Sequence, residues 1–192
     1  EDIALMRVLP NMKVIVPCDS VEAKKATIAA AKIWGPIYIR LAREKIPIFT
    51  DKETPFIPGK VEVFYQSKKP QVAIIGCGPI LYNALLAAKE LEKEKIGTIV
   101  LNNHTIKPID EKKIIEIAKK YKAIVTVEEH SVFGGLGSAV AEVLAKNCPT
   151  AMEFVGTKDA FGESGDPKDL MKKYGLGVKD IMAAVKRVIR KT

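Results

Sequence analysis

Apolar positions along the chain follow two periods, one typical of strands and one typical of helices. Short runs rich in β-branched residues predict buried strands, and longer segments with one apolar face predict helices. Expected strands occupy residues 13–17, 36–41, 60–65, 71–76, 97–102, 123–128 and 150–156. Expected helices occupy residues 21–34, 78–95, 111–121 and 135–146, and two more follow Asp166-Pro167 and include residues 178–189. This alternation predicts an α/β fold.

The first regular unit, residues 13–41, is a strand, a helix and a strand. Asp19 and Glu22 have the spacing of a capping box at the start of the helix, and Gly35-Pro36 ends it. A helix between two apolar strands predicts parallel pairing with a right-handed crossover. The unit has too few strands to bury both faces of a sheet, and the chain opens at Glu1 without a Met. We therefore expect it to be the end of a domain that begins upstream.

Residues 42–59 differ in pattern from the segments on either side. They contain three prolines and several charged residues, and they show no period. This composition predicts a loop or linker. The alternation in residues 60–65 then favours an edge strand, and a second regular run of strands and helices continues to the C-terminus.

Composition and charge favour a globular protein that binds neither nucleic acid nor a membrane. Of the 192 residues, 47% are hydrophobic and 28% are charged, which excludes a disordered chain. The net charge of +8 comes from basic pairs scattered over many helices, without the aromatic residues that stack on bases. No apolar run approaches the roughly 20 residues of a membrane helix. Three widely spaced cysteines and no export signal favour reduced thiols in the cytoplasm.

Two glycine turns invite comparison with nucleotide-binding loops. They are Gly76-Cys77-Gly78 and Gly135-Leu136-Gly137, each after a strand and before a helix. The dinucleotide fingerprint needs a small residue three positions after the second glycine, where this chain has Leu81 and Val140. The strand after Gly76 also ends in Asn102 rather than in an acid, and no P-loop sequence occurs. We expect these glycines to permit tight turns and close packing.

Polar groups at the ends of strands are the remaining candidates for chemistry. Glu128, Glu129 and His130 follow one strand, and His104 follows another. Ligands gather at the carboxyl ends of strands in open α/β sheets, so the first three are candidate acid and base groups. The alternative, which we favour, is that they orient loops through hydrogen bonds. The two histidines do not have metal-ligand spacing with the cysteines.

Arg43 follows the strand at residues 36–41, at or just past its carboxyl end. A guanidinium in this place presents a rigid set of donors suited to phosphate or carboxylate. The alternative is an ordinary surface ion pair with Glu44 or another acid.

Several motifs together resemble the C-terminal third of a transketolase. They are EDIALMRVLPNMKVIVPCD, GPIYIRLAREKIP, HTIKPID, VTVEEHSVFGGLGSAVAE and FGESGDPKDLMKKYGL, in the family's order and over nearly the whole chain. The resemblance implies a partial parallel α/β domain of the pyrimidine-binding type at residues 1–57, including the linker. A three-layer α/β C-terminal domain with a mixed five-stranded sheet would follow at residues 58–192.

The resemblance also implies a function and a site. Such enzymes, which serve the pentose phosphate pathway, transfer a two-carbon ketol unit between phosphorylated sugars with thiamine diphosphate and Mg²⁺. The ligands of both lie upstream in the family pattern, so no catalytic, cofactor-binding or metal-binding residue is expected in this chain. The family's sugar-phosphate arginine corresponds to Arg43. The glycine turn at residues 134–137 belongs to the last domain and is implied to be architectural.

The resemblance leaves several alternatives open. The expected partners are sugar phosphates and either a second copy of the chain or an N-terminal transketolase chain. Without that upstream part, we expect the 192-residue chain to be inactive. Deoxyxylulose-phosphate synthase and the beta chain of 2-oxo-acid dehydrogenases share the layout, and a non-catalytic assembly domain is the alternative of a different class. No role for His104 or His130 follows from the resemblance.

Overall fold

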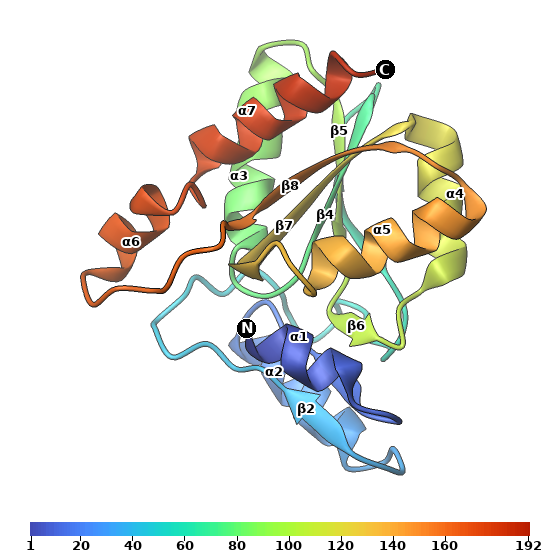
Figure 1. The fold of residues 1–192 in the computed structure, drawn as a ribbon, viewed down its shortest axis with the longest axis vertical. Helices are drawn as coiled ribbons and strands as arrows, with labels where there is room; N and C mark the ends of the chain where they lie inside the picture. Colours follow the sequence, from blue (N-terminus) through green and yellow to red (C-terminus); the bar gives the residue numbers. More distant parts are fainter.

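The computed structural model describes residues 1–192 and contains two β-sheets of unequal size. Figure 1 shows the larger sheet between layers of helices, with the smaller sheet beneath it next to the N-terminus. The two sheets are formed largely by different parts of the chain, and β6 (Thr105–Lys107) of the smaller sheet comes from the part that forms the larger one.

The larger sheet has five strands in the order β3-β5-β4-β7-β8. Four strands are parallel, and β3 pairs with β5 in the antiparallel direction at one edge. The predicted mixed five-stranded sheet and its edge strand are confirmed. The strands are β3 (Glu62–Gln66), β4 (Val72–Gly76), β5 (Thr98–Asn102), β7 (Ala123–Ser131) and β8 (Ala151–Thr157).

Helices cover both faces of this sheet and make it a three-layer structure (Figure 1). On one face, α3 (Leu81–Lys93) and α7 (Val178–Ile189) bury an apolar stripe against the sheet. On the other face, α4 (Glu111–Tyr121) and α5 (Leu136–Asn147) do the same. Strands covered on both sides bury nearly all their residues, which explains their continuous apolar runs. The short helix α6 (Pro167–Lys173) has no buried residue.

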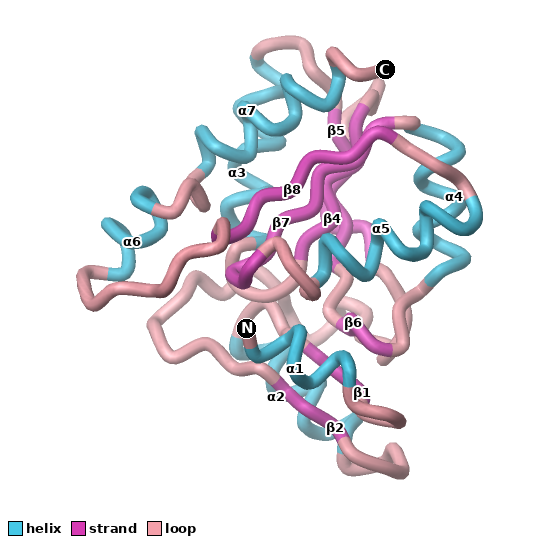
Figure 2. Tube along the Cα trace, in the orientation of Figure 1, coloured by secondary structure: helices cyan, strands magenta, loops and turns pink.

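The smaller sheet has three strands in the order β2-β1-β6. The predicted βαβ unit is confirmed, because β1 (Lys13–Ile15) pairs in parallel with β2 (Ile37–Ile39) across α2 (Ser20–Ala30). The third strand, β6 (Thr105–Lys107), comes from the later part of the chain and pairs antiparallel with β1. Figure 2 shows these short strands apart from the larger sheet.

The pattern of residues did not predict β6 or the first helix, α1 (Asp2–Val8). The helix α1 has seven residues, of which only Ile3 is fully buried. Its sequence therefore shows little of the apolar repeat that predicts a helix. The end of α1 is fixed by the ammonium group of Lys107, which donates to the carbonyl oxygens of Arg7 and Leu9 at 2.8 and 2.7 Å. The last residue of β6 thus stabilises a helix near the N-terminus.

Two predicted helices start or end differently in the structure. The helix expected over 21–34 ends at Ala30, because the chain turns before Gly35, which has φ of 101°. The helix expected from Gly78 begins at Leu81, after a turn in which Gly78 has φ of 70°. Residues 42–59 contain neither helix nor strand, as expected.

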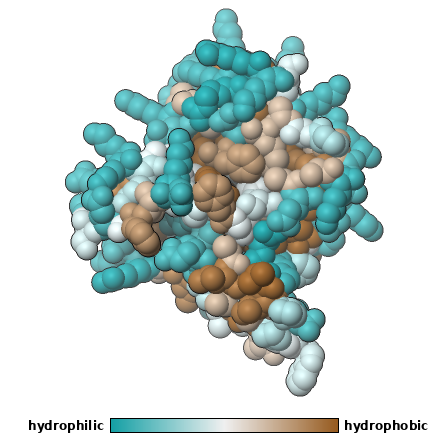
Figure 3. Space-filling model, in the orientation of Figure 1, coloured by the Kyte–Doolittle hydropathy of each residue, from teal (hydrophilic) through white to brown (hydrophobic).

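Most of the surface is polar, and one of its apolar areas lies near the N-terminus. Figure 3 shows hydrophobic atoms gathered in the lower part of the view, where Figure 1 places α1. The exposed apolar side chains here are Leu5 and Val8 of α1 and Leu9, which follows the helix. They stand on the side of α1 away from the buried Ile3.

Candidate functional site

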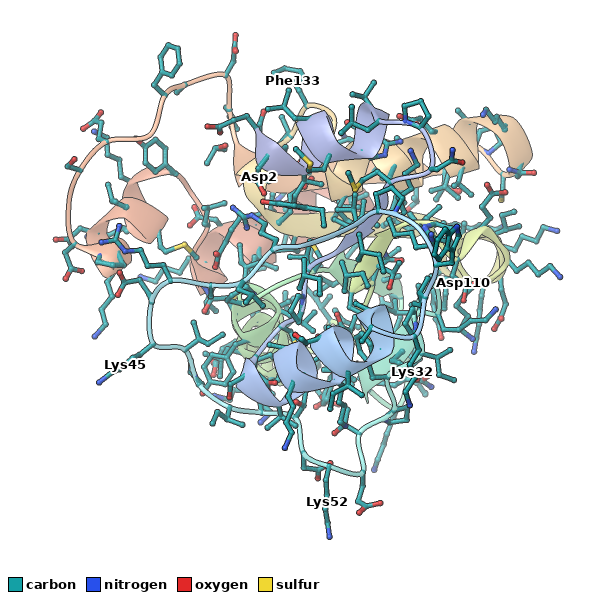
Figure 4. The ribbon with its side chains drawn as sticks, turned by 90° about the horizontal axis from the view of Figure 1, so that it is seen from below. Asp2, Lys32, Lys45, Lys52, Asp110 and Phe133 are labelled. Atoms are coloured by element: carbon teal, nitrogen blue, oxygen red, sulfur yellow. The ribbon has the colours of Figure 1, made fainter.

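The loop that carries Arg43 begins where the chain leaves the smaller sheet. The amide of Arg40 donates to the carbonyl oxygen of Ile15 at 2.9 Å, and this is the last backbone contact of the strand. We call residues 40–50 the Arg43 loop. Arg43 is exposed in it, four residues after the last residue of β2. Figure 4 shows Lys45 of the same loop pointing away from the body of the protein.

The guanidinium of Arg43 has no partner within the chain. Arg7, Arg40 and Arg187 form ion pairs with carboxylates, whereas Arg43 does not. The alternative interpretation of Arg43, an ion pair with Glu44 or another acid, is therefore not observed. An exposed guanidinium retains all its donors for an external anion.

Arg40 has a structural partner in α1. Its Nε donates to Asp2 Oδ2 at 2.9 Å, and the hydroxyl of Tyr38 donates to the same oxygen at 2.9 Å. Partial burial raises the pKa of Asp2, but the Arg40 charge and the Tyr38 hydroxyl together lower it below its usual value. The start of the Arg43 loop is thus joined to α1.

The end of the Arg43 loop is held by Asp19, the N-cap residue of α2. Its Oδ2 accepts hydrogen bonds from the amides of Phe49 and Thr50 at 2.9 and 2.7 Å. Its Oδ1 accepts from the Glu22 amide at 2.9 Å and from the Thr50 hydroxyl at 2.7 Å. Burial alone would raise the pKa of Asp19, but these donors lower it. A carboxylate that sequence predicts to cap a helix also fixes a loop about thirty residues later.

Glu22 connects α2 with the larger sheet. Its carboxylate accepts from the Cys18 amide at 2.7 Å and from Asn102 Nδ2 at 2.7 Å. Asn102 is the last residue of β5. In a capping box this glutamate would accept the amide of the N-cap residue, Asp19, but here it accepts the preceding amide. Burial raises the pKa of Glu22 despite these hydrogen bonds.

The glycine turn before α5 encloses a carboxylate of the protein itself. The two oxygens of Glu128 accept hydrogen bonds from the amides of Leu136 and Gly137 at 2.7 and 2.8 Å. Amides at a helix N-terminus are the donors that commonly bind phosphate. Burial raises the pKa of Glu128 to about 7, although both amides lower it. The turn at residues 134–137 is therefore filled and architectural.

The glycines of this turn leave no room for a side chain. A Cβ added at Gly135 would lie 2.0 Å from Glu128 Oε2, and one added at Gly137 would lie 2.6 Å from Phe154 Cδ1. Gly134 has φ of 77°, a conformation that other residues rarely adopt. The close approach of Glu128 thus requires glycine at position 135, whereas the approach of Phe154 requires it at position 137.

His130 joins the same turn to α1. Its Nδ1 lies 2.7 Å from the carbonyl oxygen of Ser131 and donates to it, so Nε2 is the acceptor. The amide of Ala4 donates to Nε2 at 3.4 Å. Burial lowers the pKa of His130, which keeps this acceptor neutral. Of the three candidate acid and base groups, Glu128 and His130 are engaged in holding backbone.

Glu129 is the third candidate and is not used in this way. It is half-buried, and it follows Glu128 on β7. Burial raises its pKa, and the nearby charge of Arg40 opposes that rise. The charge of Arg40, at the start of the Arg43 loop, is therefore close enough to act on Glu129.

His104 lies beneath the linker. Its Nδ1 is 2.8 Å from the hydroxyl of Thr105, and its ring is stacked on Phe56 with centroids 4.2 Å apart. Burial lowers the pKa of His104 to about 4. The imidazole is therefore neutral at neutral pH and packs as part of the contact between the linker and β6.

The remaining groups indicate no further chemistry. The three cysteines, Cys18, Cys77 and Cys148, are free thiols, and burial raises the pKa of Cys18 and Cys77. No group of three or more metal-ligating side chains is assembled. None of the helices has both the length and the apolar composition needed to cross a bilayer.

The sequence proposes Arg43 as a candidate but does not show how its loop is positioned. The spacing of Asp19 and Glu22 indicates only a local helix start, because the residues they hold, Phe49, Thr50 and Asn102, are distant in sequence. The sequence shows only an acidic residue at a helix N-cap and a second acidic residue in the first turn of a helix with many alanines. That signal does not specify a partner.

Comparison with known proteins gives the same family for both parts of the chain. The sequence model of the family described as "Transketolase, C-terminal domain" matches residues 59–181. The one described as "Transketolase, pyrimidine binding domain" matches residues 1–48.

Individual relatives are considerably longer than this chain. A 6-deoxy-6-sulfo-D-fructose transketolase subunit from Clostridium sp. (strain MSTE9) is 41% identical over 188 residues, which is 98% of this chain and 58% of that protein. Transketolase from Rattus norvegicus is 38% identical over 100% of this chain and 31% of its own length. A solved structure described as "Split gene transketolase, inactive beta4 tetramer" superimposes with a TM-score of 0.94 at 46% identity, over 99% of this chain and 62% of that one. The chain thus spans less than two thirds of each.

Proposed function

The chain belongs to the transketolase family, and on this basis we propose that it is the C-terminal part of a thiamine diphosphate-dependent transketolase. The complete enzyme would transfer a two-carbon ketol unit between phosphorylated sugars. Residues 1–57 would be the second half of the pyrimidine-binding domain with its linker, and residues 58–192 the C-terminal domain.

The observation that carries the proposal within this chain is the unpaired guanidinium of Arg43. It is exposed, it forms no ion pair, and its loop is held at both ends by Arg40 and Asp19. We assign Arg43 to the phosphate group of the sugar. A guanidinium can donate two parallel hydrogen bonds to a phosphate, which fixes the far end of the substrate. Binding energy from that remote group can then align the reacting carbons.

Thiamine diphosphate and Mg²⁺ do not match any set of residues within this chain. The helix N-terminus best suited to a diphosphate, that of α5, already has the Glu128 carboxylate on its amides. In the family's reaction the cofactor supplies the carbanion chemistry. We therefore assign its ligands, and those of Mg²⁺, to residues outside this chain.

A partner chain would supply the missing ligands. The similar solved structure is described as a split gene transketolase in an inactive beta4 tetramer, and the Clostridium relative is described as a subunit. We propose that this chain works in complex with an N-terminal transketolase chain and that two such units assemble around the active sites. Alone, it should form inactive assemblies and bind thiamine diphosphate no more tightly than millimolar. Titration calorimetry on the isolated chain tests this, and micromolar binding would contradict it.

Substitution of Arg43 tests the phosphate contact. In the assembled enzyme, Arg43→Ala should raise the KM for phosphorylated sugars roughly ten-fold or more, because a charge-assisted hydrogen bond contributes roughly 1.5–3 kcal/mol. The matched control is Lys45→Ala, which removes a neighbouring exposed cation of the same loop. An unchanged KM in Arg43→Ala, or an equal change in both variants, would refute the assignment.

We also propose which anionic group the bound sugar carries, a phosphate. The Clostridium relative is described by a sulfo-sugar, and a sulfonate is, like a phosphate, a tetrahedral anion that a guanidinium can bind. Product analysis of the assembled enzyme with ribose 5-phosphate and xylulose 5-phosphate, beside the sulfonate analogue of a ketose phosphate, separates the two. Formation of deoxyxylulose phosphate or oxidative decarboxylation of a 2-oxo acid would instead favour the related enzymes. Failure of every candidate N-terminal chain to restore activity would favour a non-catalytic assembly domain.

A further inference from the structure

We propose that Asp19 is a positioning residue for the phosphate contact, because it fixes the end of the Arg43 loop relative to both sheets. The inference rests on the proposed function, since it assumes that Arg43 binds the substrate phosphate. Asp19 itself lies at the N-terminus of α2 and does not contact the substrate in this scheme.

The position of the Arg43 loop depends on the hydrogen bonds at its two ends. At the first end, Arg40 is bound to the backbone of Ile15 and to the side chain of Asp2. Between residues 41 and 48 the loop forms no hydrogen bond with the rest of the chain. At the second end, the amides of Phe49 and Thr50 are bound by Asp19. Loss of either end would therefore widen the volume that Arg43 samples.

Asp19 is suited to this role because a carboxylate accepts at both oxygens. Four donors converge on it, two at each oxygen, and the residue is 2% exposed. An asparagine of the same shape would place its NH₂ group against at least one backbone amide. Such a buried, unsatisfied pair of donors is costly, so Asp19→Asn should release one of these contacts.

The same helix turn is fixed to the larger sheet by Glu22. Its amide donates to Asp19, while its carboxylate accepts from Asn102 at the end of β5. Asp19 and Glu22 together therefore define where the Arg43 loop ends with respect to the carboxyl edge of the larger sheet. A second support lies just beyond the loop, where Lys25 donates to the carbonyl oxygens of Asp51 and Thr54.

The test compares substrates with and without phosphate in the assembled enzyme. Asp19→Asn should raise the KM for a phosphorylated ketose donor roughly ten-fold, and it should leave the kcat and the KM for hydroxypyruvate, a donor without phosphate, within about two-fold. A general loss of structure would change both donors alike. The matched control is Asp110→Asn, which alters the N-cap of α4, a helix that forms no backbone hydrogen bond with the Arg43 loop.

A second variant covers the case in which Asp19→Asn does not fold. Thr50→Val removes only the hydroxyl that donates to Asp19 and keeps the side-chain volume. It should raise the same KM about three-fold. Trypsin provides a measure of loop position that is independent of activity: cleavage after Arg43 and Lys45 should be several-fold faster in Asp19→Asn than in the unmodified protein, and unchanged in Asp110→Asn.

The outcomes separate the two proposals. If Arg43→Ala raises the KM for phosphorylated donors and neither Asp19→Asn nor Thr50→Val does, the positioning role is overturned and the phosphate contact stands. If Arg43→Ala also leaves that KM unchanged, the phosphate contact itself fails. Equal changes with both donors in Asp19→Asn would likewise overturn the positioning role.

Discussion

Replacement of Gly135 by alanine would test whether the turn before α5 is built around Glu128. An added Cβ would lie 2.0 Å from Glu128 Oε2 and 2.8 Å from His130 Nδ1, well inside van der Waals contact. The carboxylate cannot stay in place, and it would have to release the amides of Leu136 and Gly137. Gly135 has φ of −83°, so it does not occupy the left-handed region that favours glycine.

The expected loss of stability follows from the two amides. A buried donor left without a partner costs about 1–3 kcal/mol, so the loss of both amide contacts in Gly135→Ala should lower the free energy of unfolding by about 2–6 kcal/mol. Urea unfolding followed by far-UV circular dichroism measures this, since the single tryptophan, Trp34, is exposed and reports poorly on burial. The control is Gly162→Ala, where an added Cβ meets nothing within 4 Å and the change should stay within about 0.5 kcal/mol.

A double-mutant cycle makes the reasoning refutable. In a Glu128→Ala background the colliding carboxylate is absent, so Gly135→Ala should cost at least about 1 kcal/mol less than in the unmodified protein. Equal costs in both backgrounds would show that Glu128 is not the reason for this glycine. A cost below about 0.5 kcal/mol for Gly135→Ala alone would refute the tight packing of the turn.

Two further predictions concern stability. The fold favours the neutral form of His104, so the stability that this preference provides is fully present above its ordinary pKa of 6.5 and is lost as the pH falls towards about 4. That interval corresponds to roughly 3 kcal/mol. Between pH 7 and pH 4, the free energy of unfolding should therefore fall less in His104→Phe than in the unmodified protein, and an equal fall would contradict the burial argument. Asp110 caps α4 by accepting a hydrogen bond from the Lys113 amide, and it also accepts one from the Val61 amide. Asp110→Ala should therefore lower the free energy of unfolding by about 1–2 kcal/mol. An unchanged melting temperature would contradict a stabilising role of this cap.

The larger sheet could be predicted because each of its strands is a local signal. Strands β4, β5 and β7 are buried on both faces, so their apolar runs are continuous and bounded by glycine or polar residues. The helices between them have strong periods for the same reason. The three residues of β6 carry no comparable signal, because their pairing with β1 is set by tertiary packing.

The candidate site, too, could be predicted only where its features are local in sequence. Arg43 stands out in the sequence because its chemistry and its place after a strand are both local features. The functions of Asp19 and Glu128 depend on amides far along the chain or across a turn, at Thr50 and Gly137. Sequence placed both acids at the ends of elements, but a carboxylate in that place is equally suited to substrate chemistry and to holding backbone. Only the hydrogen bonds distinguish the two.

The pairing of β6 with β1 has a consequence for biosynthesis. About ninety residues separate the two strands in sequence, so the first unit cannot complete its sheet on the ribosome until residue 107 has emerged. Until then the side of β1 that later receives β6 is an open edge, available to other nascent chains. If the first unit were transferred to another protein without residues 105–107, that edge of β1 would stay exposed.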